Sequence, residues 1–247
     1  MSTSTKRVPQ PTKSAIEAAV AADSRENAGI WSENAALREA VFGNISQASR
    51  AAAEGLQLAP ESQGVVVQAA LAMDIAGESG RAQSLIQDLD KRYPLDTQVQ
   101  SLWLPAARAR LALNHKNPVD ALRALQNVEP PLEFGATQFM VNPSCIYPTY
   151  VKGQAYLASG QRSEAAKEFQ KIIAHSGMVW NCATGALPHL GLARAYVQQR
   201  RNATGAEADA ARVHALTQYK QLLELWKDAD PDVPVYKAAK DEYSRLL

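Results

Sequence analysis

Histidines are the first side chains to consider for chemistry, because a neutral imidazole binds metal ions and transfers protons near pH 7. The 247-residue chain has four, and no two of them stand three or four residues apart, as two ligands on one helix face would. None has beside it the cysteine or carboxylate pattern of a metal site. We therefore expect solvated or capping roles for the four residues, which are His115, His175, His189 and His214.

The carboxylates and the nucleotide-binding motifs lead to the same expectation. Asp228, Asp230 and Asp232 have the spacing of the first calcium-loop ligands, but the glycine and the distal glutamate of such a loop are missing. A solvated capping turn is the interpretation that we favour. The sequence also lacks a glycine-rich nucleotide loop, an HRD-type catalytic loop and a DFG motif, all of which kinase chemistry requires. We predict no catalytic residue, no cofactor, no metal and no enzyme activity.

The two cysteines are too few for a disulfide framework. The N-terminal residues MSTSTKRVPQPTK lack the apolar core of a signal peptide, so a cytoplasmic location is expected. No apolar run approaches the ~20 residues that span a bilayer, which predicts no membrane span in this chain. In a reducing cytoplasm, both cysteines should be free thiols.

Composition favours closely packed helices. Hydrophobic residues make up 46% of the chain and aromatic residues only 6%, while alanine abounds. Alanine is the best helix former, whereas strands prefer β-branched and aromatic residues. The formal net charge of +1 gives no whole-chain reason to expect nucleic acid or an anionic membrane as partner.

The chain is organised around residues 147–173, whose pattern predicts two helices joined by a tight turn. Gly153 and Tyr156 fall in the first helix, and Ala165 and Phe169 fall in the second. Small residues at a crossing let two helices approach to ~8–10 Å, and aromatic residues three or four positions on cover the same face. The spacing therefore predicts a closely packed helical hairpin.

This order of small and aromatic residues resembles a tetratricopeptide repeat. The resemblance implies an all-α, right-handed superhelical solenoid of about five helix pairs with a C-terminal capping helix. Pro60 and Pro94 lie 34 residues apart, as do Gly43 and Gly77, which supports this period. We expect a disordered leader over 1–13 and a solenoid over 14–247. Its repeats should lie near 29–62, 63–96, 102–135, 146–179 and 186–229, with the capping helix at 234–247.

Two stretches depart from the regular period. A proline-containing linker is expected over Glu129–Pro143, within and after the third repeat. In the fifth repeat, Ala215 and Tyr219 lie 19 and 23 residues after Tyr196, where the repeat would place 9 and 13. The extra residues, 198–214, either lengthen one or both helices or form a projecting loop.

Four segments further resemble the repeat region at the C-terminal end of certain bacterial serine/threonine protein kinases. They are AALREAVFGNISQASRAA, YPTYVKGQAYLASGQRSEAAKEFQKII, GALPHLGLARAY and LLELWKDADPDVPVYKAAKDEY. The resemblance implies a non-catalytic protein–protein interaction scaffold or sensor module associated with kinase-type signalling. The alternative is the regulatory C-terminal region of such a kinase, with its catalytic domain absent from this chain.

In this repeat class, the first helix of each pair lines a concave groove that holds a protein or peptide ligand. Tyrosine, tryptophan and arginine are enriched at binding hot spots. For the aromatic residues, packing between neighbouring repeats is the alternative. The oligomeric state stays open. The predicted groove residues are Glu33, Trp103, Arg110, Tyr147, Tyr150, Gln154 and Arg194.

The repeat register also relates the two cysteines. Cys145 lies just before the first helix of the 146–179 repeat, and Cys182 lies in the loop before the next first helix. Neighbouring helix axes are ~8–10 Å apart, so the two Cα atoms should lie within ~15 Å of each other. A disulfide would require the loops to lean together, and free thiols are the expected state.

Overall fold

The computed structural model describes residues 10–128, 145–179, 182 and 184–247. Every regular element in these ranges is helical and none is a strand, which confirms the predicted all-α class. Among the same residues, no helix is both long and apolar enough to cross a membrane. The predicted linker, Glu129–Pro143, lies outside the described residues.

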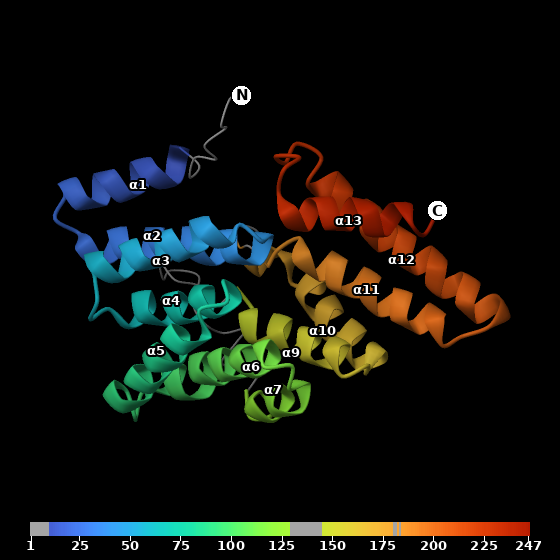
Figure 1. The fold of residues 1–247 in the computed structure, drawn as a ribbon, viewed down its shortest axis with the longest axis horizontal. Coiled ribbons are helices and arrows are strands. Elements are labelled where there is room, and N and C mark those ends of the chain that lie inside the picture. The colour runs from blue at the N-terminus through green and yellow to red at the C-terminus, as the bar shows by residue number, and fades with distance from the viewer. Residues whose placement is uncertain (1–9, 129–144, 180–181, 183) are drawn as a thin grey trace. The chain divides into compact units, whose positions relative to one another are not determined.

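The described residues belong to two compact units, residues 10–89 and the residues from 90 onward, and each is considered by itself. The first unit consists of successive helices joined by short turns (Figure 1). Gly43 and Gly77 end two of these helices with φ values of 87° and 88°, a left-handed conformation that glycine adopts without steric cost. The helices are α1 (Gln10–Ala21), α2 (Arg25–Phe42), α3 (Ile45–Leu58), α4 (Gln63–Ile75) and α5 (Ser79–Arg92).

Helix α1 corrects one predicted boundary. It begins at Gln10, so residues 10–13 are helical and do not belong to a leader that ends at residue 13. Pro11 falls in the first helical turn, where its missing N–H would have had no partner within the helix. An ion pair of 3.5 Å between Lys13 and Glu17, which lie four residues apart, further stabilises this helix.

Small residues dominate the core of the first unit. Its central cluster consists of alanines and one methionine from α2, α3, α4 and α5, all nearly or fully buried. A Cβ added at Gly29 of α2 would lie 2.9 Å from the Val65 side chain and 3.2 Å from the Gly55 carbonyl oxygen. The absence of side chains at such positions lets the helices approach closely.

The second unit continues with helical pairs. A π-helical turn, η1 (Val99–Trp103), leads into α6 (Leu104–Asn114), and Pro118 begins the next helix. The Asn117 side chain caps that helix by accepting the Asp120 N–H at 3.1 Å. The further elements are α7 (Pro118–Ala124), α9 (Tyr147–Ala158), α10 (Arg162–Ala174), η2 (Ser176–Met178), α11 (Leu187–Arg201), α12 (Gly205–Leu225) and α13 (Pro234–Ser244).

Phe169 of α10 is the centre of the three-helix contact between α9, α10 and α11. The ring is fully buried, and a Cβ added at Gly153 of α9 would lie only 2.7 Å from it. A Cβ added at Gly191 of α11 would overlap the same ring. Residues 147–173 therefore form the closely packed hairpin that their spacing predicts.

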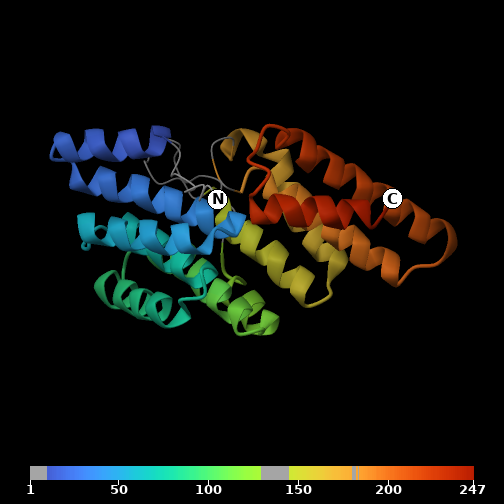
Figure 2. The same ribbon diagram turned by 45° about the horizontal axis from the view of Figure 1, so that its top comes forward.

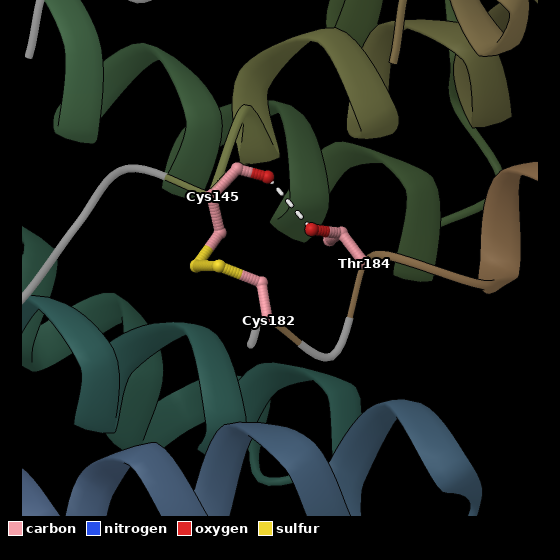
Figure 3. The surroundings of a disulfide bond; sticks show 3 residues. All are labelled: Cys145, Cys182 and Thr184. Atoms are coloured by element: carbon pink, nitrogen blue, oxygen red, sulfur yellow. Dashed lines mark hydrogen bonds between the residues drawn. A yellow bond between two sulfur atoms is a disulfide. The ribbon is translucent and has the colours of Figure 1, made fainter. Parts of the chain in front are cut away.

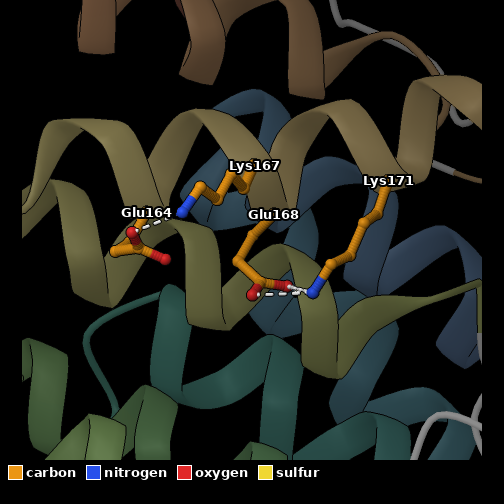
Figure 4. A network of polar contacts seen from close by, with 4 residues as sticks. All are labelled: Glu164, Lys167, Glu168 and Lys171. Atoms are coloured by element: carbon orange, nitrogen blue, oxygen red, sulfur yellow. Dashed lines mark hydrogen bonds and ion pairs between the residues drawn. The ribbon is translucent and has the colours of Figure 1, made fainter.

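Helix α10 also carries two ion pairs between residues three apart (Figure 4). Lys167 Nζ lies 2.7 Å from a Glu164 carboxylate oxygen, and Lys171 Nζ lies 2.9 Å from Glu168. Both lysines are more than half exposed, so such pairs stabilise the helix by only ~0.2–0.5 kcal/mol each. Glu164 and Lys167 lie on the solvated side of α10, whereas the Glu168 side chain is only 8% exposed.

Residues 198–214, the extra residues of the predicted fifth repeat, are mostly helical. Helix α11 has 15 residues and extends to Arg201, and α12 has 21 residues and begins at Gly205, with a short turn between them. Figure 2 shows the two as a long hairpin in orange. The insert therefore lengthens both helices, and the alternative of a projecting loop is wrong.

The C-terminal helix α13 covers the α11–α12 hairpin with an apolar face. Ala239 and Leu246 are buried in a cluster with residues of α11 and α12, and Val235 and Tyr243 pack against that cluster. The structure therefore places an apolar face of the predicted 234–247 helix against this hairpin. Tyr236 is also buried, at 5% exposure, and its ring contacts Trp226.

Cys145 and Cys182 form a disulfide, with a Cα–Cα distance of 5.7 Å (Figure 3). The predicted proximity is confirmed, whereas the expectation of free thiols is wrong for this structure. The Thr184 hydroxyl donates a 2.7 Å hydrogen bond to the Cys145 carbonyl, which holds the two loops together. Because α9 and α11 pack against each other, the loops that precede them emerge side by side.

Candidate functional site

Glu33, the predicted groove residue of the first unit, is fully buried and thus unavailable to a partner. A Cβ added at Gly55 of α3 would overlap the Glu33 carboxylate, so the carboxylate fills the space that the glycine leaves. Neither carboxylate oxygen has a hydrogen-bond partner within the described residues. Burial therefore raises the pKa of Glu33 well above its usual value.

The three predicted aromatic residues pack inside the second unit. Trp103, Tyr147 and Tyr150 are 7%, 2% and 8% exposed. The Tyr150 ring lies 6.2 Å from Tyr147 and 6.0 Å from Phe169, in the tilted and edge-on arrangements that aromatic pairs prefer. For these residues, the structure favours the alternative of packing over groove contact.

The predicted polar residues of the second unit come together across three helices. Arg110 of α6 donates to Gln154 of α9 at 3.4 Å and to Asn114 at 2.7 Å. Burial raises the pKa of the Tyr150 hydroxyl, while Arg194 of α11, Arg110 and a hydrogen bond with Gln154 act in the opposite direction. We call Arg110, Tyr150, Gln154 and Arg194 the polar row.

Glu242 of α13 continues the polar row. Both of its oxygens accept hydrogen bonds from Arg194, at 2.7 and 2.9 Å, and the Tyr219 hydroxyl donates to one of them at 2.7 Å. Burial acts to raise the pKa of Glu242, but the bonds from Arg194 and Tyr219 outweigh it and lower that pKa. Arg194 is therefore fixed in place by a bidentate ion pair.

A pocket of about 600 Å³ opens beside this ion pair, between α11 and α13, with Leu157 of α9 and Tyr219 of α12 also in its walls. We call it the arginine pocket. Its charged lining consists of Arg194, Arg200, Arg201, Arg245 and Glu242. Four cations face one anion, which leaves a local excess of three positive charges in a chain of formal net charge +1.

Three of these arginines are exposed and unpaired. Among the described residues, the side chains of Arg200, Arg201 and Arg245 form no ion pair and no hydrogen bond. Apolar side chains from Leu157, Val197 and Leu246 line other parts of the same pocket. The pocket thus combines unpaired positive charge with apolar surface.

The arginine pocket was not predicted from the sequence, although the spacing of two of its arginines was visible there. Arg194 and Arg201 lie seven residues apart, so one face of a helix carries both. Arg245 comes from the C-terminal helix, and only the tertiary structure brings it to α11. Within the described ranges, no cluster of histidine, cysteine, aspartate and glutamate could hold a metal ion.

No protein-family model matches this sequence, and no curated protein matches it significantly.

Proposed function

We propose that this chain is a non-catalytic protein-binding module of the tetratricopeptide-repeat class, a right-handed solenoid that holds a partner peptide against the second unit. The observation that carries the proposal is the polar row, in which α6, α9 and α11 contribute side chains to one connected set. In this repeat class, first helices are the ones expected to face the partner.

The residue types of the row suit a binding surface. Arginine is enriched at hot spots, and here Arg110 and Arg194 are held on helices rather than on loops. Arg194 is also pre-organised by Glu242, so less side-chain freedom is lost when a ligand binds. Rigid helices with pre-set donors favour recognition of an extended or helical peptide.

The kinase-type resemblance of the sequence supports a scaffold or sensor role in bacterial signalling. The alternative is a regulatory region that acts on a serine/threonine kinase catalytic domain located elsewhere. A partner that proves to be such a catalytic domain would favour the alternative, and a partner of another class would favour the scaffold.

Two observations bear differently on the location. The N-terminal composition led to the cytoplasmic prediction, whereas the Cys145–Cys182 disulfide is typical of oxidising compartments. Alkylation of free thiols during lysis of the native cells, followed by mass spectrometry, decides between them. Alkylated Cys145 and Cys182 would support the cytoplasm, and unmodified cystine would support an oxidising compartment.

A pull-down from native lysate tests the proposed function. The paired substitutions Arg110→Ala and Gln154→Ala remove two members of the polar row and leave the Arg194–Glu242 ion pair in place. We expect them to abolish capture of the partner that the unmodified chain retains. The control pair, Lys167→Ala and Gln170→Ala, changes exposed residues of α10 and should capture the partner normally. Equal capture by both folded variants would contradict the proposal.

A further inference from the structure

Only part of the positive charge in the arginine pocket is balanced by Glu242, which pairs with Arg194 and is also influenced by the charge of Arg245. Arg200 and Arg201 approach it from the last turn of α11, and Arg245 approaches it from the C-cap of α13. A cation at a helix C-terminus interacts favourably with the helix dipole, but this interaction falls off within the last turn. It does not explain why two different helices direct arginines into the same pocket.

Arg194 adds a fixed set of donors at the inner end of the pocket. A guanidinium has five N–H donors, and the Glu242 ion pair uses the Nε–H and one N–H of Nη2. The remaining donors form no hydrogen bond within the described residues, and the side chain is 41% exposed. Arg194 is therefore both oriented and available to an acceptor group.

The composition of the pocket restricts its occupant. An excess of three positive charges favours an anionic ligand, and planar guanidinium groups match carboxylates in a bidentate geometry. Leu157, Val197 and Leu246 offer apolar surface that a bare anion would leave uncovered. A peptide segment in which an apolar side chain is flanked by glutamate or aspartate satisfies both features.

We propose that the arginine pocket recognises an internal acidic segment of the partner protein, with an apolar side chain against Leu157 and Val197 and carboxylates on the arginines. This inference rests on the proposed function and deepens it by giving the partner's chemistry. Because Arg200, Arg201 and Arg245 are exposed, binding weakens as salt increases.

Fluorescence anisotropy of the full chain with synthetic peptides tests this assignment. The probe is a dodecapeptide with a central leucine flanked by four glutamates, labelled at the N-terminus and amidated at the C-terminus. In the matched peptide, glutamines replace the glutamates. We expect the glutamate peptide to bind at least tenfold more tightly at 50 mM salt, and this preference to shrink at 300 mM salt.

A charge reversal in the protein tests whether the pocket arginines are responsible for this preference. Arg200→Glu combined with Arg201→Glu changes two exposed residues whose side chains form no ion pair or hydrogen bond within the described residues, so the fold should be retained. Affinity for the glutamate peptide should fall at least tenfold, and a lysine version of the peptide should then become the preferred ligand. The control variant, Lys116→Glu with Lys220→Glu, has the same net charge, but neither position lines the pocket. It should bind as the unmodified chain does.

Three results would overturn the assignment. The first is equal affinity for the glutamate and glutamine peptides. The second is an equal loss of binding in the pocket variant and the control variant, since general charge would then account for it. The third is a preference for a single-stranded RNA oligomer over the glutamate peptide. If these results appear while the pull-down still depends on Arg110 and Gln154, the proposed function stands and only the assigned chemistry fails.

Discussion

Glu33 is the residue whose environment differs most from its sequence-based prediction. It lies fully buried between α2 and α3, with both carboxylate oxygens unpaired within the described residues. The neighbouring Ser32 is also buried, but its hydroxyl donates to the Ala51 carbonyl at 2.9 Å. A buried polar atom without a partner costs on the order of 1–3 kcal/mol, so Glu33 is a local weakness of the first unit.

Replacing Glu33 with methionine should stabilise the chain, and more so at pH 7.5 than at pH 5. The pKa of Glu33 is raised in the folded state, so the folded state holds its proton more tightly than the unfolded state does. Stability is therefore fully present below the unfolded pKa of ~4.3 and falls as pH rises toward the raised folded pKa. Urea denaturation of Glu33→Met and of the unmodified chain at both pH values measures the difference.

The control is Glu54→Met on the exposed side of α3, which should change stability by less than ~0.5 kcal/mol at either pH. A stabilisation by Glu33→Met that is the same at pH 5 and pH 7.5 would contradict the account of Glu33.

At the scale of elements, the contact of α9, α10 and α11 depends on two glycines that face one ring. Gly153→Ala would place a Cβ 2.7 Å from Phe169, and the ring cannot move aside because it is fully buried against Gly191. Overpacking costs ~1–3 kcal/mol, which should outweigh the better helix propensity of alanine, about 1 kcal/mol. We expect a net loss of up to roughly 2 kcal/mol in thermal or urea unfolding.

Gly80→Ala in α5 is the matched control, because a Cβ there would meet nothing within 4 Å. It should be neutral or slightly stabilising. If Gly153→Ala were as stable as Gly80→Ala, the close contact at Phe169 would not determine how these helices pack.

The disulfide joins the loops that lead into α9 and α11. It closes 37 residues of sequence, and for a loop of that length the chain-entropy model gives a stabilisation of roughly 4 kcal/mol. The double substitution Cys145→Ala and Cys182→Ala should therefore lower the free energy of unfolding by up to about that amount. Urea denaturation measures the loss, and reduction of the unmodified chain should reproduce it. Unchanged stability after both treatments would contradict a structural role for the bond.

For the whole molecule, the sequence predicts those features that depend on the spacing of residues along the chain, such as helical hairpins and the distance between equivalent loops. Gly153, Ala165 and Phe169 identify a helical hairpin because residues three and four apart share a helix face. The distance between Cys145 and Cys182 also follows from a regular repeat. That these two residues form a bond depends on how two loops lean, which spacing does not determine.

In the candidate site, too, some residues could be predicted from the sequence and others could not. Sequence placed Arg110, Gln154 and Arg194 on one surface, and the structure brings them near Tyr150. The Arg194–Glu242 ion pair joins residues 48 positions apart in the sequence, so no local pattern reveals it. Arg245 and Arg201 meet at one pocket for the same reason.

The most direct test of the account places a photoreactive benzoylphenylalanine at Gln154 and asks whether it cross-links to the captured partner. The control position is Lys167, on the solvated face of α10, whose side chain is 63% exposed. We predict a cross-link from Gln154 and none from Lys167, because the partner lies against the polar row. A cross-link from Lys167 alone, or equal cross-links from both positions, would contradict the claim that this row holds the partner.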